Sequence, residues 1–553
     1  MSDYTVSDLI SEFLARIGAS TVFGIASVHN IPILDAISRR NEIRFVMARG
    51  EVGAAHMADG YARASNNLGV VMTSTGPGAA NAVAGLVEAR TASTPVLHIT
   101  GQNPLGVIGR DTGAVHDVYD QLGMLECISK AAFRIRSAAE ALGVLTRAAM
   151  TALTAPRGPV SIEVPIDVQK CCIERPLNLD TFSLELPPPV APRGQVLDQL
   201  ADMAAAAKRP MLWLGNGAAG AGAPASALLD MGFGMVTSWN GRGVVSEDHP
   251  MNLGSLNGSG LVPVEAFYET VDLMVVAGSR LRGHETAQFS VPLPATRAQI
   301  DIDPMADGRT YDNALFVLGD AGLALAGLAD RLAGRFVPDP VFATDFQAMK
   351  RETQAAFRAT LGPYASIPEQ LRAVMPDDAI WARDLTISNS TWGNRLFPLH
   401  DACCNIYPVG AGIGQGLCMG IGAALAPGGR KTVIMTGDGG FFLNVGELWT
   451  AVQEQPDLVV LVMNDRGYGV IRHIQDAQAG GRRRYDNLLG PDLEALASLA
   501  GLPFWRVSAA PAFGNAMAEA LATAGPTLVE VDMTAIGAHP PYYPFGPKAG
   551  EER

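Results

Sequence analysis

Two glycine-rich loops with acidic side chains follow apolar segments in the last third of the sequence. Segment 432–436 leads into Gly437-Asp438-Gly439-Gly440, and segment 458–464 leads into Asp465-Arg466-Gly467-Tyr468. Glycines let the backbone approach a phosphate and turn amide groups toward it. Asp438 and Asp465 can supply oxygens to a hard cation, and magnesium prefers a few carboxylates together with phosphate and water. The two loops therefore predict a site for a diphosphate and magnesium.

The two loops also resemble the signature of thiamine diphosphate-dependent enzymes, in which Gly-Asp-Gly is followed by a spacer and Asn-Asn. Here 24 residues separate Gly439 from Asn464. The resemblance implies thiamine diphosphate and Mg²⁺ as cofactors, with Asp438, Asp465 and the carbonyl of Gly467 as metal ligands. Asp465 replaces the second Asn and adds negative charge, so we expect an altered affinity but a retained site. Without the second loop, Gly-Asp-Gly would be an ordinary turn.

Motifs in the first third of the chain carry a wider resemblance. Segments 49–63, 73–81, 93–96 and 155–167 match, in order and spacing, the pyrimidine-binding domain of the acetolactate synthase and 2-oxo acid decarboxylase family. The likeness runs over nearly the whole chain.

By this resemblance, Glu51 is the carboxylic acid that hydrogen-bonds the cofactor's pyrimidine and promotes removal of a proton from the thiazolium ring. Its apolar neighbours Val52, Ala54 and Ala55 would raise its pKa. The alternative is a helix-start residue stabilised by the helix dipole.

Ile413 stands between Gly412 and Gly414, where the family has a large apolar residue that holds the two cofactor rings in a bent conformation. A glycine-rich helix-packing surface is the alternative. The residues expected to bind the cofactor are Glu51, Gly76, Pro77, Gly412, Ile413, Gly437, Asp438, Gly439, Gly440, Asp465, Gly467 and Tyr468.

Two histidines are candidate proton carriers, because imidazole exchanges protons near neutral pH. His29 resembles the proton-relay histidine of benzaldehyde lyase in position. His116 stands where acetolactate synthases and 2-hydroxyacyl-CoA lyases usually have Phe-Gln-Glu, and Ser74 stands where benzoylformate decarboxylase has a histidine. The sequence therefore matches none of these subfamilies cleanly. Both histidines could instead be surface-loop residues.

The resemblance implies an enzyme that makes or breaks a carbon–carbon bond next to a carbonyl. The leading interpretation is a carboligase or decarboxylase acting on a 2-oxo acid. The alternatives are a lyase acting on 2-hydroxy ketones or 2-hydroxyacyl thioesters, and a nucleotide-binding regulatory protein without catalysis. Glu51 and the metal loops lie in different domains, and in the family the two domains that touch one cofactor come from different chains. The resemblance therefore implies a homodimer or homotetramer with shared active sites. FAD is not predicted from the one glycine loop at 214–217.

The elements that must position these residues are apolar segments alternating with helical patterns. Segments 21–25, 69–73, 95–100, 211–214, 273–277, 432–436 and 458–464 read as buried strands. Proline-rich stretches at 187–192 and 336–340 read as linkers. The sequence thus predicts an α/β fold of three doubly wound parallel-sheet domains: pyrimidine-binding 1–185, central 193–335 and diphosphate-binding 345–553.

Composition supports a globular protein of ordinary balance. Of the 553 residues, 48% are hydrophobic and 17% charged, and the net charge is -14. An acidic chain argues against a nucleic-acid partner, and no apolar run is long enough to predict a membrane span. The six cysteines show no zinc or disulfide spacing, so we expect free, mostly buried thiols in the cytoplasm.

Overall fold

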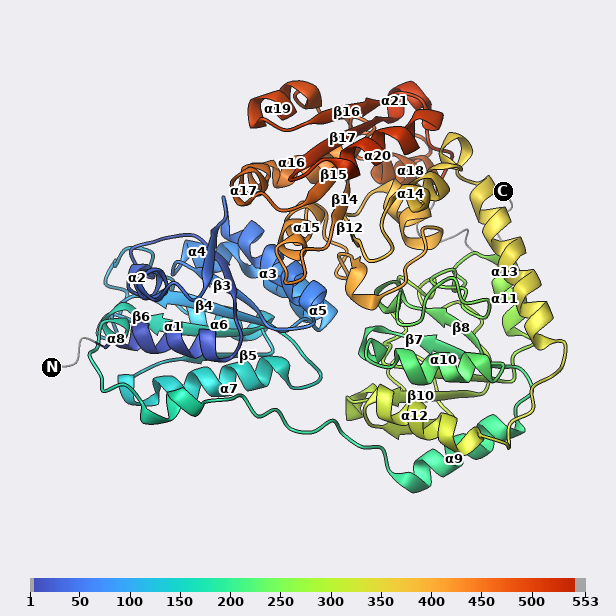
Figure 1. Ribbon diagram of the computed structural model, residues 1–553, viewed down its shortest axis with the longest axis horizontal. Helices are drawn as coiled ribbons and strands as arrows, with labels where there is room; N and C mark the ends of the chain where they lie inside the picture. Colours follow the sequence, from blue (N-terminus) through green and yellow to red (C-terminus); the bar gives the residue numbers. More distant parts are fainter. Residues whose placement is uncertain (1–3, 543–553) are drawn as a thin grey trace.

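Three parallel β-sheets, each flanked by helices, make up the protein (Figure 1). The structure is a computed structural model that describes residues 4–542. The expected class of three doubly wound α/β domains is confirmed. The domain boundaries at 1–185, 193–335 and 345–553 stay predictions, and their outermost residues, 1–3 and 543–553, lie outside the described part of the chain.

The first sheet has six parallel strands in the order β2-β1-β3-β4-β6-β5. The strands are β1 Thr21–Gly24, β2 Arg44–Met47, β3 Gly69–Thr73, β4 Val96–Gln102, β5 Ala131–Arg134 and β6 Val160–Pro165. Its helices are α1 Val6–Arg16, α2 Ile31–Arg40, α3 Glu51–Ser65, α4 Pro77–Asn81, α5 Val83–Ala92, α6 Gln121–Ile128, α7 Ala141–Leu153 and α8 Ile166–Gln169.

The second sheet has five parallel strands in the order β11-β10-β9-β7-β8. They are β7 Pro210–Leu214, β8 Gly234–Thr237, β9 Leu273–Ala277, β10 Arg297–Asp301 and β11 Leu315–Leu318. The helices here are α9 Gly194–Ala206, α10 Gly222–Asp230, α11 Val262–Tyr268 and α12 Ala321–Leu332. The next helix, α13 Phe342–Ala359, packs Phe342 and Phe346 into this same core.

The third sheet has six parallel strands in the order β13-β12-β14-β15-β17-β16. They are β12 Ile380–Arg383, β13 Asn405–Ile406, β14 Thr432–Gly437, β15 Leu458–Asn464, β16 Phe504–Val507 and β17 Thr527–Asp532. The helices are α14 Ile367–Val374, α15 Gly416–Ala424, α16 Asp438–Leu443, α17 Leu448–Glu454, α18 Gly469–Gln478, α19 Leu493–Ala500, α20 Phe513–Ala522 and α21 Met533–Ile536.

The first and third sheets are held together by the helix pair α3 and α15 (Figure 1). Two glycines allow the close contact, because a Cβ on Gly60 would strike the backbone of Met419 and a Cβ on Gly422 would strike that of Met57. These two contacts also fix the direction: the helices run antiparallel. The start of α3 therefore lies at the end of the pair away from the start of α15.

Of the other expectations, the first linker agrees with the structure and the burial of the cysteines does not. Residues 183–193 form an exposed strand-free connection between the first two sheets (Figure 1), as the proline run predicts. All six cysteines are free, but the expectation that most are buried is wrong: Cys127, Cys171 and Cys172 are exposed. These three lie on segments outside the sheets, at the end of α6 and after α8, where no core forms over them.

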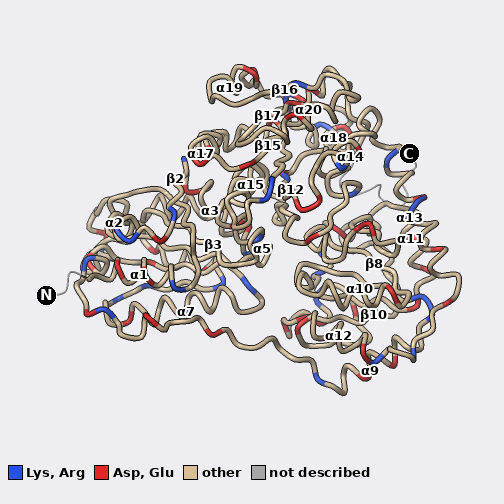
Figure 2. Tube along the Cα trace, viewed as in Figure 1, with Lys and Arg blue, Asp and Glu red and all other residues tan. Residues whose placement is uncertain are grey.

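Acidic and basic residues occur in all three domains (Figure 2). Between residues 4 and 542, none of the helices is long and apolar enough to cross a membrane.

Candidate active site

Three loops meet at the carboxyl edge of the third sheet, where its strand order reverses between β12 and β14. Ligands of open parallel sheets bind at such a point. A Cβ on Gly440 would lie 2.7 Å from Asp384 Oδ2, after β12, and a Cβ on Gly439 would lie 2.6 Å from the Tyr468 ring, after β15. Glycines at both positions leave room for these side chains. The segment Gly437–Gly440, which spans the end of β14 and the first turn of α16, therefore lies between the loops that follow β12 and β15.

Asp438 and Asp465 lie next to each other in this edge. Asp438 is buried, and its Oδ1 has no hydrogen-bond partner. Burial raises the pKa of Asp438, and burial together with the charge of Asp438 raises the pKa of Asp465 to about 7. Asp438 is buried and the Asp465 side chain is 20% exposed. Two neighbouring carboxyls that repel each other need positive charge, which a divalent cation would supply.

A magnesium ion fits this donor set. Among residues 4–542 there is no group of three or more His, Cys, Asp or Glu side chains that could hold a metal. The ion would depend on the two carboxylates, the carbonyl of Gly467, and oxygens from a phosphate or water. Magnesium is bound in this way at phosphate sites.

The extra charge of Asp465 faces a guanidinium that the sequence reading did not single out. Arg472 Nη1 lies 3.5 Å from Asp465 Oδ2 and donates to the Asp465 carbonyl at 3.0 Å, while Nε donates to Asp486 Oδ2 at 2.9 Å. A Cβ on Gly467 would collide with the Asp486 carbonyl. Segment 486–488 thus packs against the loop 465–468 and is hydrogen-bonded to it. The signal available in the sequence was an arginine one turn into the helix after Asp465.

The loop after β12 contributes polar groups that were also missed. Ser388 Oγ and both polar side-chain atoms of Asn389, Oδ1 and Nδ2, are buried without a hydrogen-bond partner. Asn389–Gly393 forms a single π-helical turn. Such turns are frequent at functional sites. Unpartnered buried polar atoms are costly unless a ligand satisfies them. They therefore fit a diphosphate at this edge.

Asp384 connects this loop to the one that carries Ile413. Its two carboxylate oxygens accept from the Gly414 amide at 3.0 Å, and burial raises its pKa to about 6. Asn444, at the end of α16, donates to the Gly414 carbonyl at 2.6 Å. Ile413 itself is 41% exposed. The glycine loop is thus held against the diphosphate loop with Ile413 projecting from it.

Glu51 opens α3 at the carboxyl edge of the first sheet. Its Oε2 accepts from Asn81 Nδ2 at 3.1 Å, and a Cβ on Gly78 would lie 2.8 Å from Oε1. The short helix α4, which begins with Pro77 after Gly76, therefore lies against the carboxyl group. Glu51 is partly exposed, and its carboxyl group is oriented by the Asn81 amide and by its close approach to Gly78.

His29 and His116 lie together at the same edge, on the loops after β1 and β4. Their ring centroids are 5.3 Å apart. His29 Nδ1 and Ser74 Oγ are buried and have no hydrogen-bond partner. Burial lowers the pKa of His29, a bond to Asn103 partly offsets this, and the His116 ring lowers it further. His116 has φ +61°, and only a glycine at position 76 fits against its carbonyl.

One chain does not bring all predicted residues together. Glu51, Gly76, Pro77, His29 and His116 gather at the first sheet. The residues of the third sheet are Gly412, Ile413, Gly437, Asp438, Gly439, Gly440, Asp465, Gly467 and Tyr468. Because α3 and α15 run antiparallel, Glu51 and the Ile413 loop lie toward opposite ends of that helix pair.

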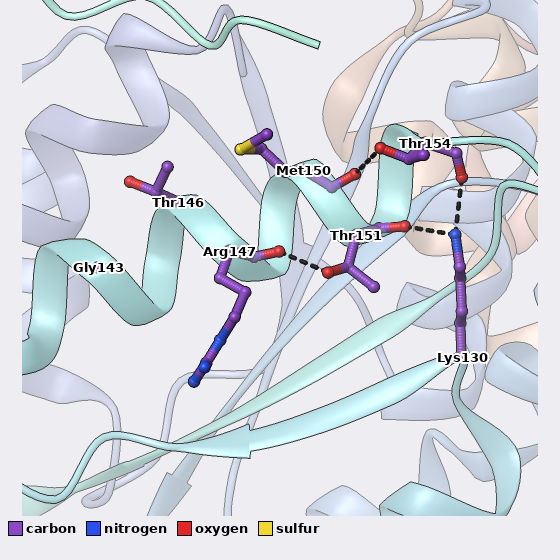
Figure 3. Close-up of a pocket in the computed structure, with 7 residues that line it drawn as sticks. All are labelled: Lys130, Gly143, Thr146, Arg147, Met150, Thr151 and Thr154. Atoms are coloured by element: carbon purple, nitrogen blue, oxygen red, sulfur yellow. Dashed lines mark hydrogen bonds between the residues drawn. The ribbon is translucent and has the colours of Figure 1, made fainter. Parts of the chain in front are cut away.

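A separate surface depression of about 580 Å³ lies on α7 (Figure 3). Lys130, which precedes β5, donates to the carbonyls of Thr151 and Thr154 at 2.7 Å each. It thus satisfies the end of α7 at the amino edge of the sheet, opposite His29. This depression has no part in the site.

Comparison with known proteins identifies the class. Residues 4–124 match the thiamine pyrophosphate enzyme N-terminal binding domain, residues 197–328 its central domain, and residues 388–531 its C-terminal binding domain. The chain belongs to the thiamine pyrophosphate enzyme family, and thiamine diphosphate, the same compound, is its cofactor. The resemblance seen in the sequence is confirmed, and the non-catalytic alternative is set aside.

Named relatives cover most of the chain. It is 31% identical to a probable 2-ketoarginine decarboxylase of Pseudomonas aeruginosa, over 90% of this chain and 86% of the relative. It is 29% identical to the large subunit of acetolactate synthase isozyme 1 of Escherichia coli, over 85% and 84%. It is 27% identical to a chloroplastic acetolactate synthase of Arabidopsis thaliana, over 95% and 81%.

The metal assignment predicts a specific loss of cofactor binding. Asp438→Ala should weaken binding of thiamine diphosphate with Mg²⁺ by about 100-fold or more, because a ligand is removed from a site with few of them. Asp457→Ala, at the other end of β15, is the matched control and should bind as the parent does. Calorimetric titration measures both. Equal affinity of Asp438→Ala and the parent would contradict the assignment.

Proposed function

We propose that this enzyme uses thiamine diphosphate and Mg²⁺ to decarboxylate a 2-oxo acid or to transfer the remaining acyl unit to an acceptor. The observation that carries the proposal is the carboxyl pair Asp438–Asp465, at the same sheet edge as the loop whose Ser388 and Asn389 have buried unpartnered atoms. The names of the relatives, acetolactate synthases and a 2-ketoarginine decarboxylase, support the substrate class.

The chain's residues divide into two groups. The loops 437–440 and 465–468 would hold the diphosphate through backbone amides and through magnesium at Asp438, Asp465 and the Gly467 carbonyl. Ile413 would support the rings. When bound, thiamine diphosphate supplies a nucleophilic carbon that attacks a carbonyl and an electron sink for the bond that breaks.

Glu51 would hold a proton at the pyrimidine nitrogen. Its Oε2 accepts a hydrogen bond from the Asn81 amide, and this bond holds the carboxyl group in one orientation. The other oxygen faces Gly78, whose missing side chain leaves room beside it. A carboxyl oriented in this way can share a proton with a ring nitrogen without losing its position.

His29 and His116 would move protons on the substrate. They lie 5.3 Å apart, and the buried Nδ1 of His29 has no partner inside the chain. The lowered pKa of His29 keeps it neutral at pH 7, ready to accept a proton. The unpartnered Ser74 hydroxyl lies among the same loops and could hydrogen-bond a substrate oxygen.

The role of His29 predicts a loss of turnover without loss of cofactor. His29→Ala should lower kcat by roughly 100- to 10,000-fold, the usual range for an acid–base group, with thiamine diphosphate affinity unchanged. Because its pKa is lowered, the parent should keep its activity to below pH 6.5, the ordinary imidazole value, and lose it as the ring gains a proton. His249→Ala, in the central domain, is the control. Unchanged kcat in His29→Ala would make the residue a bystander.

We further propose a homodimer or homotetramer whose active sites are shared between chains. The antiparallel α3–α15 pair, with Glu51 and the Ile413 loop toward its opposite ends, supports a site that a partner chain completes. Large apolar side chains at these loops support an interface, each with at least 41% of its surface exposed: Val28, Ile31, Val115, Tyr119, Ile413 and Leu443.

We also propose a cytoplasmic location, which the free exposed thiols of Cys171 and Cys172 support.

A product screen tests the function. Protein loaded with thiamine diphosphate and Mg²⁺ should release carbon dioxide from at least one member of a panel of 2-oxo acids. The remaining acyl unit should leave as an aldehyde or be ligated to an added aldehyde or second 2-oxo acid. Glu51→Gln, which keeps the size of the side chain, should bind the cofactor and give no product, because an amide cannot cycle a proton. Cleavage of 2-hydroxy ketones alone would favour the lyase alternative, and a loaded protein inert to the whole panel would contradict the proposal.

A further inference from the structure

A buried carboxylate of the third domain caps the helix that carries Glu51. Glu447 ends the short turn Val445–Glu447 between α16 and α17 and is 3% exposed. Its oxygens accept from the backbone amide of Arg49 at 3.0 and 3.1 Å and from that of Gly50 at 3.0 Å. Thr450 Oγ1 donates to the same carboxylate at 2.6 Å. Two backbone amides of the first domain thus bind a carboxylate of the third domain, and a hydroxyl of the third domain holds that carboxylate in place.

The start of α3 has no cap of its own. Gly50 is the N-cap residue and offers no side chain, so the amides there depend on an outside acceptor. A carboxylate at a helix N-terminus also interacts favourably with the helix dipole. A Cβ on Gly53 would collide with Glu447 Oε1, so the glycine makes room for it. The position of Glu51, the first residue of α3, therefore depends on a side chain almost 400 residues away in sequence.

Glu447 is also attached to the diphosphate loop. Its amide donates to the Asn444 carbonyl at 2.9 Å, and Asn444 follows α16, which begins at Asp438. The Asn444 side chain holds the Gly414 carbonyl beside Ile413. A movement at Asp438 can thus reach Gly50 through one helix, one turn and one carboxylate.

We propose that Glu447 is a positioning residue that couples occupancy of the diphosphate and metal loops to the order of the helix start presenting Glu51. The inference rests on the proposed function. In the proposed shared-site oligomer, the diphosphate loops of a chain serve one cofactor and its Glu51 serves another. The Glu447 contact therefore links two active sites through the interior of one chain.

Magnesium pyrophosphate tests the coupling, because it has neither ring of the cofactor and cannot reach Glu51. In the parent, it should slow hydrogen–deuterium exchange in peptides 437–447 and also in peptides 49–56. In Glu447→Gln, the first effect should remain and the second should disappear, with basal exchange at 49–50 faster by about 10-fold or more, as for a lost hydrogen bond to a charged group. Glu454→Gln is the matched control. It breaks another contact between the same domains, Arg44 Nε to Glu454 Oε2 at 2.9 Å, and should behave as the parent does.

Every other outcome is decisive. Slowed exchange at 49–56 in Glu447→Gln, or its absence in the parent when 437–447 is protected, overturns the coupling alone. Absence of protection at 437–447 in the parent, with either pyrophosphate or thiamine diphosphate, overturns the proposed function on which the coupling rests. If Glu447→Gln does not fold, Thr450→Val removes one donor at nearly constant volume and should weaken the protection of 49–56 in the same direction.

Discussion

The repulsion between the carboxyls of buried Asp438 and partly buried Asp465 is the constraint on which the site depends. Two such groups stay side by side only with a shared proton or with positive charge. Their raised pKa values and the unpartnered Asp438 Oδ1 express the same need. A metal bound to a diphosphate answers it, since it brings positive charge and its own oxygen ligands. Arg472 supplies only part of that charge, from 3.5 Å on the Asp465 side.

The parallel sheets explain why these groups meet at all. Strands that run in one direction place all their following loops at one edge, and the reversal of strand order leaves a crevice there. Because Gly439 and Gly440 have no side chains, the Tyr468 ring and the Asp384 carboxylate of the neighbouring loops can pack directly against the backbone there. The same rule brings His29, Ser74 and His116 to one edge of the first sheet. The carboxyl edge of the third sheet would thus bind the diphosphate, and the same edge of the first sheet would carry the groups that transfer protons.

Local patterns predicted the elements well and the contacts between distant segments poorly. Strands at 69–73, 273–277 and 458–464 agree with the structure at both ends, because continuous apolar runs mark buried parallel strands. The nearness of His29 and His116 could not be read from their spacing, because it depends on the path of the loop after β4. Asp384, Arg472 and Glu447 were missed for a similar reason: each acts on a backbone that a sequence pattern does not place beside it. Burial of the cysteines could not be predicted from residue type, because it depends on where each segment lies: Cys127 is at the end of α6, and Cys171 and Cys172 follow α8.

Glu51 and the loops of Asp438, we propose, complete one active site only across two chains. Pairing two defective chains tests this. Glu51→Gln chains and Asp438→Ala chains, each inactive alone, are given different affinity tags, mixed, and purified as heterodimers through both tags. Each heterodimer then contains one site with both residues intact and one with neither, so we expect clear activity, up to about half that of the parent dimer. Purified heterodimers without activity would contradict the account, because they would show that both residues must come from one chain.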